Sequence, residues 1–127
     1  MQVLTRVFPV QIDDMHELSI IEGIIKITEE EVKKYEVNRI IQIRLKVGII
    51  SGIMPSLLQE YFSIASKGTV VEGAVLKIET VPLRIKCLNC ECENIMENIK
   101  IKCPICKSSD LKILSGRELY IDSLEVE

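Results

Sequence analysis

Apolar and polar residues follow each other along this chain with two different periods, and each period predicts a different kind of element. Apolar residues at helical spacing predict a first helix from His16 to about Glu36, with one face turned towards the core. Its apolar positions are Leu18, Ile21, Ile25 and Val32. A second helix is predicted from Pro55 to about Ser66, because proline is favoured in the first turn of a helix.

Three other segments alternate apolar and polar residues, which is typical of a half-buried strand. These segments are residues 41–47, 74–81 and 117–127. In the last one the apolar positions change parity between Ile121 and Leu124, so we expect a β-bulge near Asp122 and Ser123. The whole pattern predicts an α+β fold, with two helices on a three-stranded sheet and an insertion before the last strand.

All five cysteines lie in that insertion, and four of them form two C-x2-C hooks separated by twelve residues. The four are Cys87, Cys90, Cys103 and Cys106. This spacing lets four thiolates hold one tetrahedral ion, and a closed set of four leaves no position for water or substrate. We therefore predict a structural Zn(II) site in a zinc ribbon, residues 83–114, with a short hairpin over residues 94–102. Catalytic dithiols and an iron site of the rubredoxin type are the alternatives.

The fifth cysteine, Cys92, follows the first hook closely. We expect it to be a spare thiol, with ligand exchange or a second metal contact as the alternative. Five cysteines behind an amino terminus that does not resemble a signal peptide favour a reducing, cytoplasmic location over a disulfide framework.

Composition and charge narrow the choice of partners. Apolar residues make up 47% of the chain and charged residues 28%, which favours a folded globular protein over a disordered one, and no apolar run is long enough to span a membrane. The net charge of −3 attracts neither nucleic acid nor an anionic membrane. In the ribbon, six basic residues are balanced by four acidic ones and by the −2 charge of a zinc tetrathiolate. With no aromatic residue there either, an RNA-binding ribbon is a minor alternative.

His16 is the single histidine, and it lies at the start of the first predicted helix. A histidine in this place is ordinarily a solvated or capping residue, and the functional alternative is a metal ligand. With one histidine and a closed thiolate set, the chain lacks a nucleophile–base pair, so we predict that it is not an enzyme.

Several segments, taken in order, resemble the HypA family of nickel metallochaperones, which serve in the maturation of NiFe hydrogenases. They are "MHELSIIEGI", "LKVGIISGI", "LLQEYFSIASKGTVVEGAVLKIE", the paired hooks and "GRELYIDSLEVE". The resemblance covers residues 15–127, and it is specific because the M-H-E start, the hook spacing and the closing strand occur in the family's order.

The resemblance implies two metals and two partners. Zinc would be held by the four hook cysteines in a structural role. Nickel would be held at Met15, His16 and Glu17, where Ni(II) favours a square-planar set of imidazole and backbone nitrogens, with the Glu17 carboxylate outside the ligand set. The implied partners are a HypB-like GTPase and the hydrogenase large subunit, and self-association into a homodimer is left open.

The first fourteen residues depart from the family pattern, because an internal Met15 has no free amine to complete such a chelate. We interpret residues 1–14 as an extension that results from an upstream start or is removed; the alternative is a weaker nickel site centred on His16. The predicted domains are this extension, a nickel-binding α/β domain of residues 15–82 and 115–127, and a zinc ribbon of residues 83–114. The main rival function is a zinc-ribbon adaptor that binds only proteins.

Overall fold

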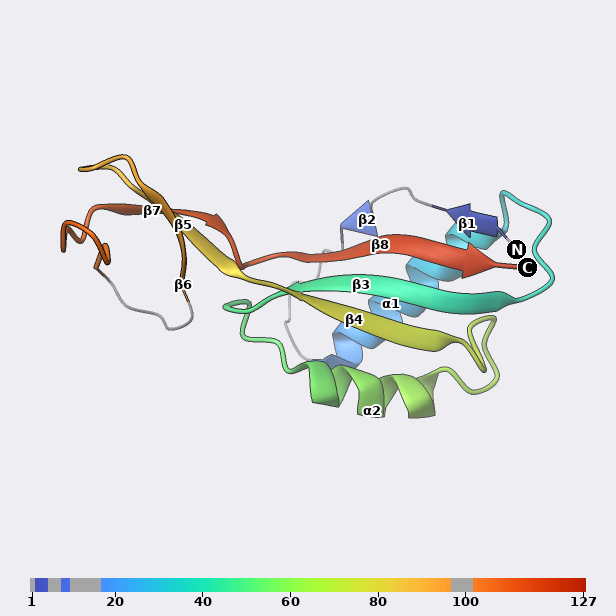
Figure 1. Ribbon diagram of the computed structural model, residues 1–127. Helices are drawn as coiled ribbons and strands as arrows, with labels where there is room; N and C mark the ends of the chain where they lie inside the picture. The colour runs from blue at the N-terminus through green and yellow to red at the C-terminus, as the bar shows by residue number, and fades with distance from the viewer. Residues whose placement is uncertain (1, 5–7, 10–16, 97–101) are drawn as a thin grey trace.

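The computed structural model describes residues 2–4, 8–9, 17–96 and 102–127 (Figure 1). Within these residues the helices are α1 (Glu17–Val32) and α2 (Pro55–Ala65). The strands are β1 (Gln2–Leu4), β2 (Phe8–Pro9), β3 (Ile40–Gly48), β4 (Val75–Val81), β5 (Leu83–Cys87), β6 (Glu93–Met96), β7 (Leu111–Ser115) and β8 (Leu119–Val126). The predicted α+β class is confirmed. Neither described helix is long and apolar enough to cross a membrane.

The larger sheet has the strand order β1-β8-β3-β4, and β2 also pairs with β8. β3 and β4 run parallel, because α2 connects them as a crossover, whereas β3 and β8 are antiparallel. β3 is therefore flanked by strands on both sides. Its alternating residues Ile43, Leu45 and Val47 are at most 1% exposed.

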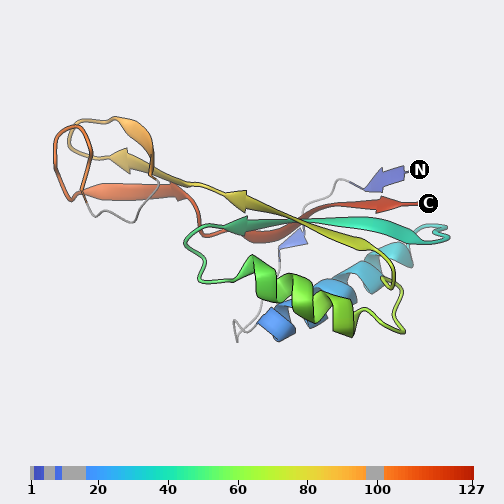
Figure 2. The same cartoon turned by 60° about the horizontal axis from the view of Figure 1, so that its bottom comes forward.

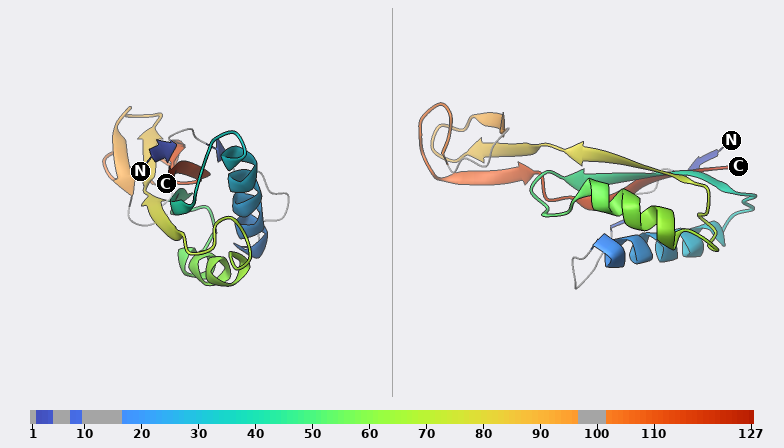
Figure 3. Two further views of the ribbon diagram at one scale, coloured as in Figure 1. Left: turned by 90° about the vertical axis from the view of Figure 1, so that its right-hand side faces the viewer. Right: turned by 90° about the horizontal axis from the view of Figure 1, so that it is seen from below.

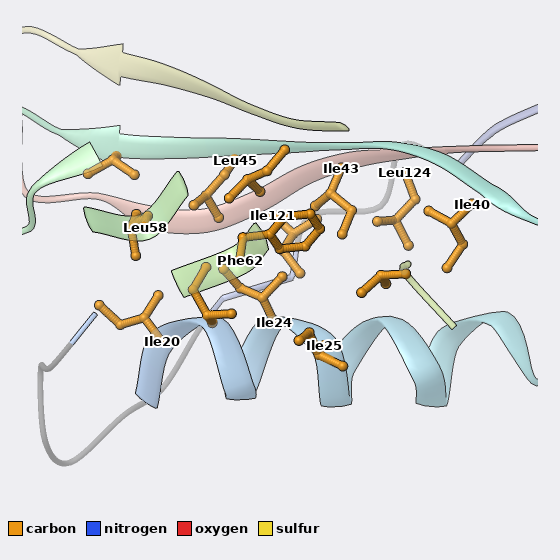
Figure 4. Packing of buried hydrophobic residues seen from close by; sticks show 14 of the residues in the cluster. Ile20, Ile24, Ile25, Ile40, Ile43, Leu45, Leu58, Phe62, Ile121 and Leu124 are labelled. Carbon is orange, nitrogen blue, oxygen red and sulfur yellow. The ribbon is translucent and has the colours of Figure 1, made fainter. Parts of the chain in front are cut away.

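Both helices pack on the same face of this sheet (Figures 2 and 3). In Figure 4, Ile20 of α1 lies beneath Leu58 of α2, and Ile24 of α1 lies beneath Phe62 of α2 and Ile121 of β8. Burying one such side chain contributes about 1.5–3 kcal/mol, which outweighs the few tenths of a kcal/mol that isoleucine costs in a helix relative to alanine. Packing against the sheet therefore stabilises α1 more than its helix propensity does.

The buried face of α1 differs from the predicted one. Leu18, which the pattern assigned to the core, is 42% exposed. The buried residues of α1 are Ile20, Ile21, Ile24, Ile25, Thr28 and Glu31. The prediction for Leu18 was wrong because consecutive isoleucines fit more than one helical stripe, and only the contact with the sheet selects between the stripes.

The helix α1 also ends at Val32, before the predicted end near Glu36. The residues that follow return to the sheet, where the backbone N–H groups of Asn38 and Arg39 donate to the carbonyl of Glu127 at 2.7 and 3.2 Å. These long-range bonds satisfy the backbone in place of a further helical turn.

The predicted β-bulge in β8 is confirmed. Residues 44–45 of β3 are opposite Ser123 and Ile121, so Asp122 is the extra residue of β8. The bulge restores the parity of the strand. As a result Ile121 and Leu124 both lie in the core with no exposed surface.

The sheet also contains two strands from residues before Met15. β1 pairs antiparallel with residues 124–126 of β8, and β2 with residues 120–121. Leu4 packs against the hydrophobic core. The three-stranded prediction therefore covered only β3, β4 and β8, since segments as short as β1 and β2 carry too little periodicity to be recognised.

The second sheet has the order β6-β5-β7 and projects from one end of the larger sheet (Figure 1). Its buried cluster is small: Leu83, Ile85 and Met96, with Ile50 and Leu111 packed against it. Of the predicted hairpin over residues 94–102, the first part belongs to β6, which pairs with β5, and residues 97–101 lie outside the described part of the chain. So few apolar contacts give this segment little stability of its own.

The two sheets meet where β3 ends at Gly48. The backbone N–H of Gly48 donates to the carbonyl of Glu118 at 2.7 Å, and that of Ile50 to the carbonyl of Gly116 at 2.8 Å. A Cβ at Gly48 would lie less than 3.0 Å from the carbonyl oxygen and carbon of Gly116. This close approach of two backbones requires glycine at position 48.

Candidate metal centre

Two loops of the second sheet have the same backbone conformation, and each contains one hook. In the first loop the N–H of Glu91 donates to the carbonyl of Cys87 at 2.9 Å, and in the second the N–H of Lys107 donates to the carbonyl of Cys103 at 3.0 Å. Glu91 and Lys107 both have a left-handed backbone, with φ of 63° and 65°. Each turn reverses the chain within its hook, so that both thiols of a hook point to the same side.

The four predicted sulfur atoms come together. All lie within 4.8 Å of one another, with 3.4 Å between the Sγ atoms of Cys87 and Cys106 and 3.7 Å between those of Cys90 and Cys103. A regular tetrahedron with metal–sulfur bonds of about 2.3 Å has edges of about 3.8 Å. The observed separations are close to that value, so the four thiols could hold one zinc ion.

Hydrogen bonds to the sulfur atoms prepare them to carry negative charge. The backbone N–H of Cys90 donates to Cys87 Sγ at 3.5 Å. The Nδ2 atom of Asn89 donates to Cys106 Sγ at 3.6 Å, across the two hooks. Such donors stabilise thiolates and orient them as ligands. Asn89 was not among the residues predicted from the sequence, although an amide side chain just before the second cysteine of a hook was a usable signal.

These contacts lower the pKa values of the two thiols in the second hook. Hydrogen bonds from the Asn89 side chain and then from the Ser108 backbone lower the pKa of Cys106 to about 6 against the effect of burial. Backbone hydrogen bonds from Cys106 and Ile105 likewise lower the pKa of Cys103. Thiolate therefore forms readily in this hook.

The pKa of Cys90, in the first hook, is instead raised. A backbone hydrogen bond from Cys92 lowers its pKa, but burial and the adjacent thiols of Cys87 and Cys103 outweigh this and raise it to about 12. A metal that binds here near pH 7 therefore displaces a proton from Cys90. Cys92 lies outside the group of four, and its carbonyl accepts a hydrogen bond from the Cys87 N–H at 2.9 Å.

Of the three residues predicted to bind nickel, Glu17 is described, and Met15 and His16 lie outside the described part of the chain. Glu17 is the first residue of α1, and its Oε1 accepts a hydrogen bond from the backbone N–H of Met54 at 3.2 Å. Met54 is the N-cap of α2 and makes no side-chain capping bond of its own. The Glu17 carboxylate therefore lies at the positive end of α2, where negative charge is stabilised.

The fold and the four thiols together define a class: an α+β protein with a cysteine cluster, carried on a small separate sheet, that could hold zinc. The family model for HypA, described as a hydrogenase/urease nickel-incorporation metallochaperone, matches residues 15–126. The chain belongs to the HypA family, as the sequence resemblance predicted, and nickel and structural zinc are the metals of this family.

Curated relatives and solved structures agree with the family match. The hydrogenase maturation factor HypA of Lawsonia intracellularis is 40% identical over 118 residues, covering 89% of this chain and 100% of the relative. That of Desulfitobacterium hafniense is 34% identical over 113 residues, covering 89% and 99%. The solution structure of the Ni metallochaperone HypA from Helicobacter pylori is similar with a TM-score of 0.63 and 26% identity, covering 88% of this chain and 97% of that one.

Proposed function

We propose that this chain binds Ni(II) and passes it to the large subunit of a NiFe hydrogenase, in the cytoplasm, with a HypB-like GTPase as partner and without catalysing a reaction itself. The observation that carries the proposal is the family match, which begins at Met15, the first residue of the M-H-E segment. The exposed position of Leu18, two residues past His16, supports access of a partner to this end of α1.

We propose that nickel is bound at His16 through its imidazole and through backbone nitrogens at positions 15–17. Ni(II) favours a planar set of nitrogens, and a histidine in second position forms fused chelate rings with its own amide and the preceding amine. The Glu17 carboxylate already accepts a hydrogen bond from Met54 at the start of α2. This supports the proposal that Glu17 contributes its backbone nitrogen to nickel and that its carboxylate stays outside the ligand set.

We further propose that Cys87, Cys90, Cys103 and Cys106 hold the resident zinc. When bound, this ion supplies a closed structural cross-link between the two hooks rather than a reactive water. The small apolar cluster of the second sheet supports this role, because so few buried side chains leave much of the folding energy to the metal. The division into an extension, a nickel-binding domain and a ribbon at residues 83–114 stays a prediction.

The test is calorimetric titration of Ni(II) into zinc-loaded protein, so that the hook thiols are already occupied. The full chain and a chain that begins at Met15 are each compared with their His16→Ala variants. We expect His16→Ala to abolish the nickel site in both. We also expect the chain that begins at Met15 to bind at least about tenfold more tightly than the full chain, since only there does a free α-amine lie next to His16.

The matched control is Glu17→Gln, because glutamine keeps an oxygen that can accept the Met54 hydrogen bond. Its nickel affinity should equal that of the parent chain. If His16→Ala leaves nickel affinity unchanged, the proposed site is wrong, and a zinc-ribbon adaptor becomes the better description of the protein.

A further inference from the structure

The strand β8 is paired along both of its edges, with one long strand on the inner edge and two short strands on the outer edge. On its inner edge β3 pairs with it from Leu119 to Val126. On its outer edge it is covered in two places by residues that precede the family match, β1 at residues 124–126 and β2 at residues 120–121. Figure 1 shows β1 and β2 beside β8 on the side away from β3.

The outer edge is apolar towards the helices. Leu124 has no exposed surface and Val126 only 2%, and Leu4 lies opposite Leu124 and packs against the same core. Without β1 and β2 this edge would present unpaired backbone groups beside an apolar face, and such an edge readily pairs with another strand. The two short strands therefore cover a surface suited to strand addition.

We propose that β1 and β2 act as an edge cover that keeps a second copy of this chain from pairing with β8. The competing occupant is β8 of that second copy, added antiparallel across a two-fold axis. This contact buries the same surface on both chains and closes on itself, as in most homodimers. It concerns assembly and does not rest on nickel binding.

The pattern of β8 fits such a self-pairing in one register. If the axis passes Leu124, the Leu124 side chain of the second copy takes the place that Leu4 has now. Ser123 then lies opposite Glu125 of the other copy, which avoids two opposing carboxylates. Shifting the axis by one residue towards the carboxyl terminus would place Glu125 opposite Glu125, and shifting it the other way would place Leu124 opposite Asp122, so the register centred on Leu124 is favoured.

A second copy is the favoured occupant because its own β8 supplies an apolar Leu124 at the position of Leu4 and, in the register centred on Leu124, pairs without opposing carboxylates. β8 lies inside the matched range, residues 15–126, and β1 and β2 lie outside it. The relatives from Lawsonia intracellularis and Desulfitobacterium hafniense are spanned to 100% and 99% by alignments that cover 89% of this chain. The strand β8 thus belongs to the part of the chain that matches the family, whereas β1 and β2, which cover its outer edge, precede that part.

The test uses the full, zinc-loaded chain and two matched substitutions in β1. Leu4→Thr removes the apolar contact with the core, whereas Val3→Thr changes a side chain that is 51% exposed. Molar mass is followed by light scattering over a range of concentrations. We expect the parent chain and Val3→Thr to be monomers, and Leu4→Thr to dimerise at a concentration at least about tenfold lower.

A peptide of residues 1–12 provides the second measurement. Added to the Leu4→Thr dimer, it should occupy β8 and restore the monomer, and the same peptide carrying Leu4→Thr should not. A parent chain that is already a dimer with β1 in place, a Leu4→Thr chain that stays monomeric like Val3→Thr, or a dimer that ignores the peptide would each overturn the proposal.

Discussion

The substitution Gly48→Ala should destabilise the protein more than any other glycine-to-alanine change among the glycines with described surroundings. Its Cβ would lie less than 3.0 Å from the Gly116 carbonyl and 2.5 Å from the backbone nitrogen of Arg117. Backbone atoms cannot rotate away, so β3 must separate from the segment after β7. That separation breaks the hydrogen bonds from Gly48 to Glu118 and from Ile50 to Gly116.

The magnitude follows from these contacts. Overpacking costs about 1–3 kcal/mol, and two lost backbone hydrogen bonds cost about 1 kcal/mol each. The sum, about 3–5 kcal/mol, is about a fifth or more of the stability of an ordinary domain, which is about 5–15 kcal/mol. Gly52→Ala is the matched control: nothing lies within 4 Å of its Cβ, and only its φ of 81° is unfavourable. That strain costs about 1–2 kcal/mol.

The assay is urea unfolding of the zinc-loaded protein, followed by far-ultraviolet circular dichroism and by tyrosine fluorescence, since the chain has no tryptophan. The free energy of unfolding should fall in the order parent, Gly52→Ala, Gly48→Ala. If Gly48→Ala is no less stable than Gly52→Ala, the two backbones do not approach each other as described, and the junction between the sheets is wrong.

Three further predictions concern the cysteine cluster. Removing zinc with excess chelator should collapse the amide spectrum of residues 83–115 and leave that of α1 and β3 dispersed; equal loss in both parts would contradict a structural role for the metal. Asn89→Ala should raise the pKa of Cys106 from about 6 towards its ordinary 9.0. More protons must then be displaced, so the pH midpoint of cobalt loading, read from its thiolate absorption, should move upwards, and an unchanged or lower midpoint would refute the assignment. Cys92→Ser should still bind one zinc per chain with unchanged affinity by calorimetry, whereas loss of the ion would make Cys92 a ligand.

Periodicity was enough to predict α1, α2 and the three long strands, because each buries one face against the same core. The bulge at Asp122 was also predictable, since one extra residue is what a strand needs to change parity and keep its apolar side chains on one face. The exposure of Leu18 could not be predicted, because the isoleucines of α1 fit two overlapping helical stripes. The strands β1 and β2 could not be predicted either, because each has only two or three residues and pairs with a strand more than a hundred positions away.

The cysteine cluster was predictable in its membership but not in its details. Hook spacing alone predicted which four thiols meet. The left-handed backbones of Glu91 and Lys107 and the donor Asn89 depend on how the loops fold around the sulfur atoms. The hydrogen bond between Glu17 and Met54 joins residues 37 positions apart, and no local pattern predicts it.

The loop from Ile49 to Met54 contacts both the second sheet, which carries the cysteine cluster, and Glu17 at the start of α1. At its start Ile50 packs against the buried cluster of the second sheet and donates to Gly116. At its end Met54 donates to Glu17, one residue past the proposed nickel ligand His16. Zinc bound by the four thiols would therefore also stabilise one side of this loop, since a second sheet that unfolds can no longer pack against Ile50. If nickel binds at His16 as proposed, zinc in the second sheet would stabilise the surroundings of the nickel through the packing of Ile50, its backbone hydrogen bond to Gly116 and the hydrogen bond from the Met54 N–H to the Glu17 carboxylate.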